Sequence, residues 1–276
     1  MAATKIDTRI DFETAKKYDQ LDLIDWKTKY GDFQFYLRKG LNELQYNVGA
    51  NVSKNPQSGE YIRPFVDPVM GEPLNLNEVL NQEDTWLDVG GHLALFAIRM
   101  VKQFPKIKKV ISYEALPHNV SFAVENIKLN EVEGQCEFVQ KAILPDNSEK
   151  VDFFISMDSG KHSIIPVRGR EVITVNGINI NDAIKESGCT AIKMDVEGAE
   201  YPLIKAVTDW SNIRVCVVEW HFNAMGSYKK GDSNARVNMF NEIMEIMKAN
   251  FDTIRVRPNV ENQKNFITHF VALKTK

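Results

Sequence analysis

The stretch that decides the fold is TWLDVGGHLALFAIRMVKQF, residues 85–104. Its first five residues are rich in β-branched and aromatic side chains, which is typical of a short buried strand. Gly90-Gly91 follows at once, and apolar residues then recur at spacings of three and four from Leu93 to Phe104. This period indicates an amphipathic helix. Because free N–H groups gather at a helix start, the glycine turn is a candidate ligand-binding site.

The alternation of strands and helices continues to the end of the chain. Four further strands are expected at residues 109–113, 137–139, 191–195 and 215–219. Helices are expected near 117–127, 199–207 and 237–247. Short strands or a hairpin are expected at 151–155, 163–167 and 172–175, with a closing antiparallel pair at 253–256 and 266–273. This order predicts an α/β fold with a doubly wound, mostly parallel sheet that binds ligands at the carboxyl ends of its strands.

Residues 1–80 have a different character. Residues 11–29 read as one or two short helices, and residues 33–37 as a strand. Four prolines within residues 51–74 predict irregular structure. We therefore expect an N-terminal extension at 1–80, either a lid or a packing extension, and the α/β domain at 81–276.

Composition excludes several classes of protein. The chain has 276 residues, of which 43% are hydrophobic and 26% charged, as in ordinary globular proteins. No apolar run is long enough for a membrane helix, and we expect no signal peptide. Three widely spaced cysteines favour reduced thiols and a cytoplasmic location. The net charge of −3 gives no general attraction to nucleic acid, although a local basic patch remains possible at 106–109 or 228–230.

Two acidic residues at strand ends indicate the kind of ligand. Asp88 lies two residues before Gly90, where a carboxylate would repel a pyrophosphate but favour an amino group or a sulfonium. Glu114 ends the next strand and can accept hydrogen bonds from both ribose hydroxyls. Neither a G-x-G-x-x-G fingerprint nor a Walker A loop is present in the sequence. The pair favours an adenosine ligand with a cationic tail, which describes S-adenosylmethionine.

Four segments resemble the FkbM family of S-adenosylmethionine-dependent methyltransferases. Residues 88–94 (DVGGHLA) are similar to its D-V-G-A-N-x-G motif, and 113–119 (YEALPHN) to its F-E-P-x-P-x-N motif. Residues 193–200 (KMDVEGAE) match its K-x-D-V-E-G-x-E signature, and 219–221 (EWH) its E-x-H ending. The sequence departs from the pattern at His92, Ala94 and Ala115, none of which removes a group that the chemistry requires.

The resemblance implies a Rossmann-like class I methyltransferase fold that binds S-adenosylmethionine. Lys141 and Ala142 stand where the family's fold usually contacts the adenine through backbone groups, so the resemblance implies that role for them. The expected cofactor-binding residues are Asp88, Gly90, Gly91, His92, Glu114, Lys141, Ala142 and Asp195.

Two strand ends supply candidate catalytic residues. Asp195 would lie beside the transferred methyl group as orienter or general base, although its segment could instead cap a helix together with Lys193. His221 is suited to accept a hydroxyl proton near neutral pH, with Glu219 orienting its ring or binding substrate. The expected catalytic residues are thus Asp195, His221, Glu219 and Lys193. Asp195, Glu197, Glu219 and His221 could also converge on a divalent metal, a question that the sequence leaves open.

We expect O-methylation of a saccharide or similar small molecule, with no membrane partner and an open oligomeric state. Aromatic rings could stack on a pyranose and two polar residues could hydrogen-bond to it; they are Tyr61, Phe65, Trp220, Phe222 and Tyr228, with Arg63 and Asn223. Two alternatives are an RNA methyltransferase, acting on a 2′-hydroxyl or a base, and a catalytically inactive cofactor-binding partner protein.

Overall fold

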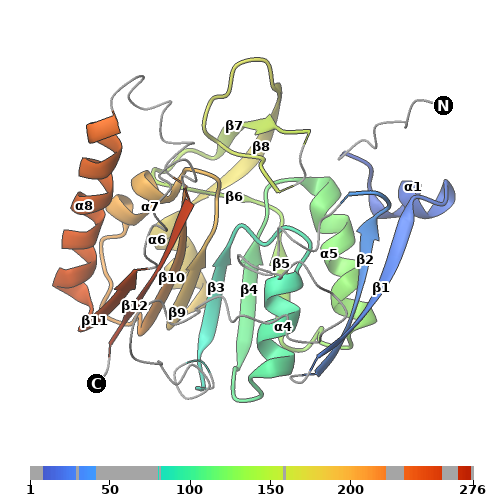
Figure 1. Ribbon diagram of the computed structural model, residues 1–276, viewed down its shortest axis with the longest axis horizontal. Coiled ribbons are helices and arrows are strands. Elements are labelled where there is room, and N and C mark those ends of the chain that lie inside the picture. Colours follow the sequence, from blue (N-terminus) through green and yellow to red (C-terminus); the bar gives the residue numbers. More distant parts are fainter. Residues whose placement is uncertain are drawn as a thin grey trace.

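The architecture is that of a computed structural model, which describes residues 9–28, 31–41, 80, 82–157, 160–221, 233–256 and 267–274. A seven-stranded sheet in the order β11-β12-β10-β9-β3-β4-β5 forms the centre of the molecule (Figure 1). Its strands are β3 (Thr85–Val89), β4 (Lys109–Tyr113), β5 (Cys136–Val139), β9 (Ala191–Met194), β10 (Val215–His221), β11 (Thr253–Val256) and β12 (Ile267–Leu273). β12 runs antiparallel to both of its neighbours, and the other neighbouring pairs are parallel.

The sheet is doubly wound, as predicted. The chain enters at β3, adds β4 and β5 on one side, and then crosses to β9 and β10 on the other side. The order therefore reverses beside β3, and ligands of such sheets bind at the carboxyl ends next to that reversal. Sequence patterns predicted the closing antiparallel pair, but not that β12 inserts between β10 and β11.

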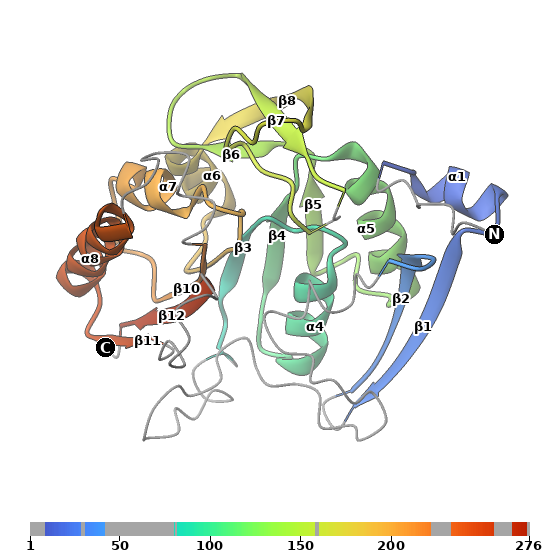
Figure 2. The same ribbon diagram turned by 45° about the horizontal axis from the view of Figure 1, so that its top comes forward.

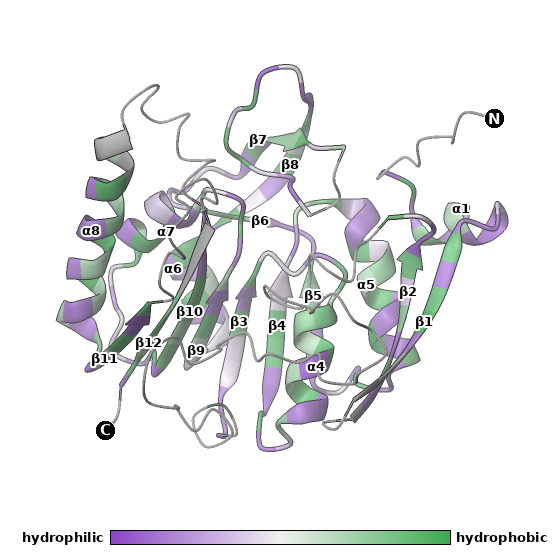
Figure 3. Ribbon diagram, in the orientation of Figure 1, coloured by the Kyte–Doolittle hydropathy of each residue, from purple (hydrophilic) through white to green (hydrophobic). Residues whose placement is uncertain are grey.

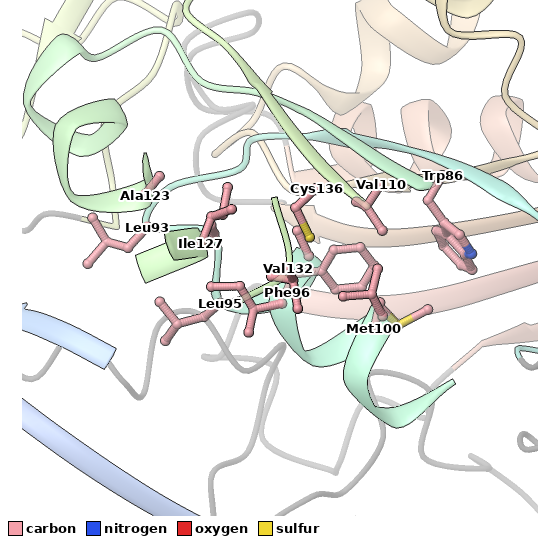
Figure 4. Close-up of a cluster of buried hydrophobic side chains, with 14 of the residues drawn as sticks. Trp86, Leu93, Leu95, Phe96, Met100, Val110, Ala123, Ile127, Val132 and Cys136 are labelled. Atoms are coloured by element: carbon pink, nitrogen blue, oxygen red, sulfur yellow. The ribbon is translucent and has the colours of Figure 1, made fainter. Parts of the chain in front are cut away.

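Helices cover both faces of the sheet because strand residues alternate between them. Trp86 and Val110 belong to the apolar cluster formed with α4 (Leu95–Gln103) and α5 (Pro117–Leu129), which Figure 4 shows. Their neighbours Leu87 and Ile111 belong to the opposite cluster. That cluster includes residues of α6 (Ile180–Ser187), α7 (Glu200–Ala206) and α8 (Ser233–Asn250). In Figure 3 much of β10 is hydrophobic, whereas β3 is paler because it mixes polar with apolar residues. No helix among the described residues is long and apolar enough to cross a membrane.

The described part of the N-terminal extension packs beside α5 (Figure 1). It consists of α1 (Phe12–Lys17) and an antiparallel hairpin of β1 (Leu21–Thr28) and β2 (Gly31–Arg38). The expected strand is confirmed and the helix at 12–17 is present, but residues 21–28 form a strand because they pair with β2 throughout. The proline-rich segment 51–74 lies outside the described residues.

A second, three-stranded sheet lies over the carboxyl ends of β4 and β5 (Figure 2). Its strands are β6 (Ala142–Leu144), β7 (Lys150–Ile155) and β8 (Glu171–Asn179), in the order β6-β8-β7. The expected hairpin is β7–β8. Residues 163–167 form no strand; Ser163 makes a single antiparallel bridge with Phe154. The sequence reading missed β6 and α6.

Candidate active site

A pocket opens between the carboxyl ends of β3, β4 and β9 and the small sheet. Its empty volume is about 700 Å³, including the space open to solvent. Six of the predicted cofactor-binding residues line it: Gly90, His92, Glu114, Lys141, Ala142 and Asp195. The sequence had placed these residues at the ends of four different strands, and the fold brings them to one cavity.

The glycine turn allows β3 and β9 to approach closely. Gly90 has φ +90°, and a Cβ there would lie 2.0 Å from the backbone oxygen of Asp195. A Cβ at Gly91 would lie 2.7 Å from Phe138 and 2.8 Å from Ser112. Both amides donate to the Tyr113 carbonyl at 3.0 Å. The glycines are therefore required by packing, and Gly91 is not part of the described pocket lining.

Asp88 and Lys193 form a buried ion pair beneath the turn. Their charged atoms are 3.0 Å apart, and Lys193 also donates to the Gly90 carbonyl at 2.6 Å. Ser112 donates to the second Asp88 oxygen at 2.8 Å. Burial raises the pKa of Asp88, although Lys193 opposes the shift. Neither residue lines the described pocket, and both hold the turn in place; the cofactor-binding role of Asp88 and the catalytic role of Lys193 stay predictions.

Glu114 is held in the pocket by two backbone amides. One carboxylate oxygen accepts from His92 N at 3.0 Å, and the other accepts from Leu116 N at 2.8 Å. Burial raises the pKa of Glu114 to about 7, although these hydrogen bonds lower it. The carboxylate is thereby fixed at the end of β4 with remaining acceptor capacity for a ligand.

Four carboxylates surround His221 at the ends of β9 and β10. We call Asp195, Glu197, Glu200, Glu219 and His221 the carboxylate–histidine cluster. Nε2 of His221 lies 3.4 Å from Glu197, 3.6 Å from Glu219 and 4.0 Å from Asp195. Asp195 and Glu197 also line the pocket, so the cluster forms part of its wall.

The other side of the imidazole is fixed by Glu200. Its Oε1 lies 2.9 Å from Nδ1 of His221 and accepts from the amides of Val196 and Gly198, each at 3.1 Å. Glu200 is completely buried. The sequence left open whether Glu200, at the start of its helix, only caps the helix; in the structure it also orients the histidine.

Burial and mutual repulsion bring two acids of the cluster into the neutral range. Burial and the charge of Glu219 raise the pKa of Asp195 to about 6. Burial raises the pKa of Glu197 to about 8, although His221 opposes it. Burial alone would lower the pKa of His221, but the charges of Glu200 and Glu197 raise it well above its ordinary value. Groups that exchange protons near pH 7 are suited to acid–base work.

The expected sugar-stacking residues are only partly described. Trp220 was expected to face the acceptor, but it is completely buried and packs against Phe240 with ring centroids 5.5 Å apart. Strand alternation explains this correction, because Glu219 and His221 share one face of β10 and Trp220 takes the other. Residues 61, 63, 65, 222, 223 and 228 lie outside the described residues.

Sequence reasoning missed the small sheet's share of the pocket. Phe153, His162 and Ile164 line it from above, and Asn119 lines it from the start of α5. Nδ1 of His162 accepts from Ser156 N at 2.9 Å. The alternating apolar pattern of β7 signalled a strand, but no local pattern shows where an inserted sheet folds back.

The fold and this pocket define a Rossmann-like class I methyltransferase. Residues 88–253 match the family described as "Methyltransferase FkbM domain", which is more than half of the chain. The chain belongs to the FkbM family of methyltransferases and uses S-adenosylmethionine as its methyl donor.

Similar folds occur among solved methyltransferase structures. An O-methyltransferase from Bacillus cereus in complex with SAH is 11% identical, with 75% of this chain and 84% of that chain covered and a TM-score of 0.40. The Methanococcus jannaschii fibrillarin pre-rRNA processing protein is 12% identical, with 71% and 68% covered and a TM-score of 0.43. Likenesses this distant assign no acceptor. A search of curated proteins found no match.

Proposed function

We propose that this methyltransferase transfers the methyl group of S-adenosylmethionine to a hydroxyl of a neutral, saccharide-like acceptor. The observation that carries the proposal is the position of the carboxylate–histidine cluster in the wall of the pocket that Glu114 and the glycine turn also line. One pocket thus offers a site for the adenosine and a proton acceptor for the hydroxyl.

The pocket lining fits the parts of S-adenosylmethionine. Glu114 would accept the ribose hydroxyls, since its carboxylate is already held by two amides. The backbone of Lys141 and Ala142, between the end of β5 and the start of β6, would contact the adenine beside Ile143 and Phe153. Asp195 places negative charge on the same wall, where the sulfonium is favoured. When bound, S-adenosylmethionine supplies a methyl group that its positive sulfur already activates.

The residues of the chain then have to align the hydroxyl and accept its proton. Asp195 would orient the acceptor, because its side chain is partly exposed to the pocket. The cluster would take up the proton, and its acids with pKa values of about 6 and about 8 can do so near neutral pH.

The charge of the site favours a neutral acceptor over RNA. Glu114, Asp195 and Glu197 line the pocket together; Asp195 is largely ionised at neutral pH and Glu114 partly so, and a phosphate chain would be repelled by these two charges. The basic run at 106–109 precedes β4 and therefore lies at the amino ends of the strands, opposite the pocket. Tyr113 and His162 also line the pocket, and their rings would be available to a sugar.

Radiolabelled methyl transfer tests the proposal. The enzyme is offered a glycan panel, a nucleotide-sugar panel, and capped and uncapped RNA, with Asp195→Asn as the variant and Glu245→Gln as an exposed-carboxylate control. We expect label in a saccharide, about 10²–10⁴-fold slower transfer by Asp195→Asn, and unchanged transfer by the control. Circular dichroism melting checks that the near-isosteric variant folds.

Three outcomes would contradict the proposal or part of it. Label found in RNA alone would replace the saccharide by a nucleic-acid acceptor. Binding of S-adenosylmethionine without label in any acceptor would favour the inactive cofactor-binding protein. Full activity of Asp195→Asn would reduce Asp195 to a structural cap.

A further inference from the structure

The carboxylate–histidine cluster has the arrangement of a cation site. One ligand atom from each of Asp195, Glu197 and His221 lies within 4.8 Å of the others. Atoms bound to one ion at about 2.1 Å are separated by about 3–4 Å, so small side-chain movements suffice to close the site. Oxygen and imidazole ligands at the ends of two neighbouring strands are thus brought together by the fold itself.

His221 supplies an observation that is independent of the acidic residues. Its Nε2 is buried, points toward Asp195 and Glu197, and has no hydrogen-bond partner among the described residues. The residue as a whole is only 3% exposed. A buried polar atom without a partner is costly, which indicates that a ligand completes this position.

Glu200 prepares that nitrogen for coordination. Its carboxylate lies 2.9 Å from Nδ1 of His221, and in the neutral tautomer with the proton on Nδ1 the Nε2 lone pair is directed at the other carboxylates. Two backbone amides hold Glu200 in turn. Metal-binding histidines are commonly oriented in this way, with a carboxylate on the ring nitrogen that faces away from the ion.

We infer that Asp195, Glu197 and Nε2 of His221 bind a divalent cation of the magnesium and manganese class. Two carboxylates suit such ions, the single imidazole favours the transition metal manganese over magnesium, and the described residues place no cysteine in the site. Glu219, whose oxygen lies 3.6 Å from Nε2, borders the site. The inference rests on the proposed function and changes one step of it: with a cation bound, Asp195 and Glu197 would be ligands and not proton acceptors, and the cation would offer an open coordination position that activates the acceptor hydroxyl.

Manganese binding tests the inference without S-adenosylmethionine or acceptor. The full chain, freed of metal with a chelator, is titrated with Mn²⁺ while the free ion is followed by electron paramagnetic resonance. Pulsed measurements on the bound ion report whether a nitrogen is coordinated. The variants are Glu197→Gln and Asp195→Asn, with Glu245→Gln as the control on an exposed carboxylate of α8.

We expect one Mn²⁺ per chain, a nitrogen coupling from His221, and affinity at least about tenfold weaker in either cluster variant. The control should bind as the wild type does. Three results would overturn the inference: no binding at millimolar Mn²⁺, binding without a coordinated nitrogen, or equal affinity in all variants. The cluster would then be a protonated His221 paired with carboxylates. Binding of S-adenosylmethionine is measured independently by calorimetry. If the cofactor binds but Mn²⁺ does not, the cation site is refuted and the proposed methyl transfer is not.

Discussion

At the scale of single residues, the site depends on backbone positions that few side chains tolerate. His92, Ala94 and Glu197 have φ values of 46°, 66° and 53°, in the left-handed region. The first two stand where the FkbM motif carries asparagine and glycine, the residues that adopt this region most readily. The departures noted in the sequence therefore keep the turn's conformation at some energetic cost. Glu197 stores similar strain in the pocket wall, where strained residues are often functional.

Glu114 should make the stability of the ligand-free protein depend on pH. Its pKa of about 7 is above its ordinary value of 4.5, so the folded chain holds a proton that the unfolded chain releases between these values. The free energy of unfolding should therefore fall as the pH rises through this window, by about 3 kcal/mol. Denaturant titrations across the window should show that Glu114→Gln lacks this part of the decline. Parallel profiles of the wild type and the variant would contradict the assignment.

At the scale of elements, two asparagines join the N-terminal extension to α5. Asn126 accepts from Tyr36 N at 2.6 Å and donates to Tyr36 O at 3.2 Å, and Asn130 makes the same pair of contacts with Gln34. The side-chain amides thus take the place of a neighbouring strand along the edge of β2. These asparagines follow the second motif in the sequence, and in the structure they hold the extension in place.

Removing one of these amides should destabilise the whole chain. Asn126 is completely buried and also donates to Leu93 O at 3.1 Å, so Asn126→Ala leaves several buried backbone groups unpaired. We expect a loss of about 2–4 kcal/mol in the free energy of unfolding. Urea titration measures it, with the exposed Lys128→Ala on the same helix as a control that should change little. A variant as stable as the wild type would show that the extension is not anchored here.

At the scale of the whole molecule, the sequence predicted those helices and strands that are determined by interactions between residues close together in the chain. Residues 95–103 and 117–129 were recognisable as helices because each buries one apolar face. The convergence of Asp195 and His221 followed from their places at neighbouring strand ends. The strand at 21–28, the insertion of β12 and the position of the small sheet depend on pairing between distant segments, which a local period does not contain. The burial of Trp220 could have been predicted, because side chains alternate between the two faces of β10 and Trp220 lies between Glu219 and His221.

The lid role of the extension stays a prediction. None of residues 9–28 and 31–41 lines the pocket, and this described part packs on α4 and α5. Any wall or lid formed by the extension would have to come from segments outside the described residues. The described residues of the extension are anchored to the two helices and do not themselves line the pocket.

The central claim is that Glu114 and the pocket around it bind S-adenosylmethionine. Isothermal titration calorimetry of S-adenosylmethionine against the wild type, Glu114→Ala and Glu245→Gln tests it most directly. Each charge-assisted hydrogen bond to a ribose hydroxyl contributes about 1.5–3 kcal/mol, so Glu114→Ala should weaken binding by about tenfold to more than a hundredfold. The Glu245→Gln control should bind as the wild type does. An unchanged dissociation constant for Glu114→Ala, in a variant that still melts cooperatively, would place the cofactor elsewhere and contradict the account.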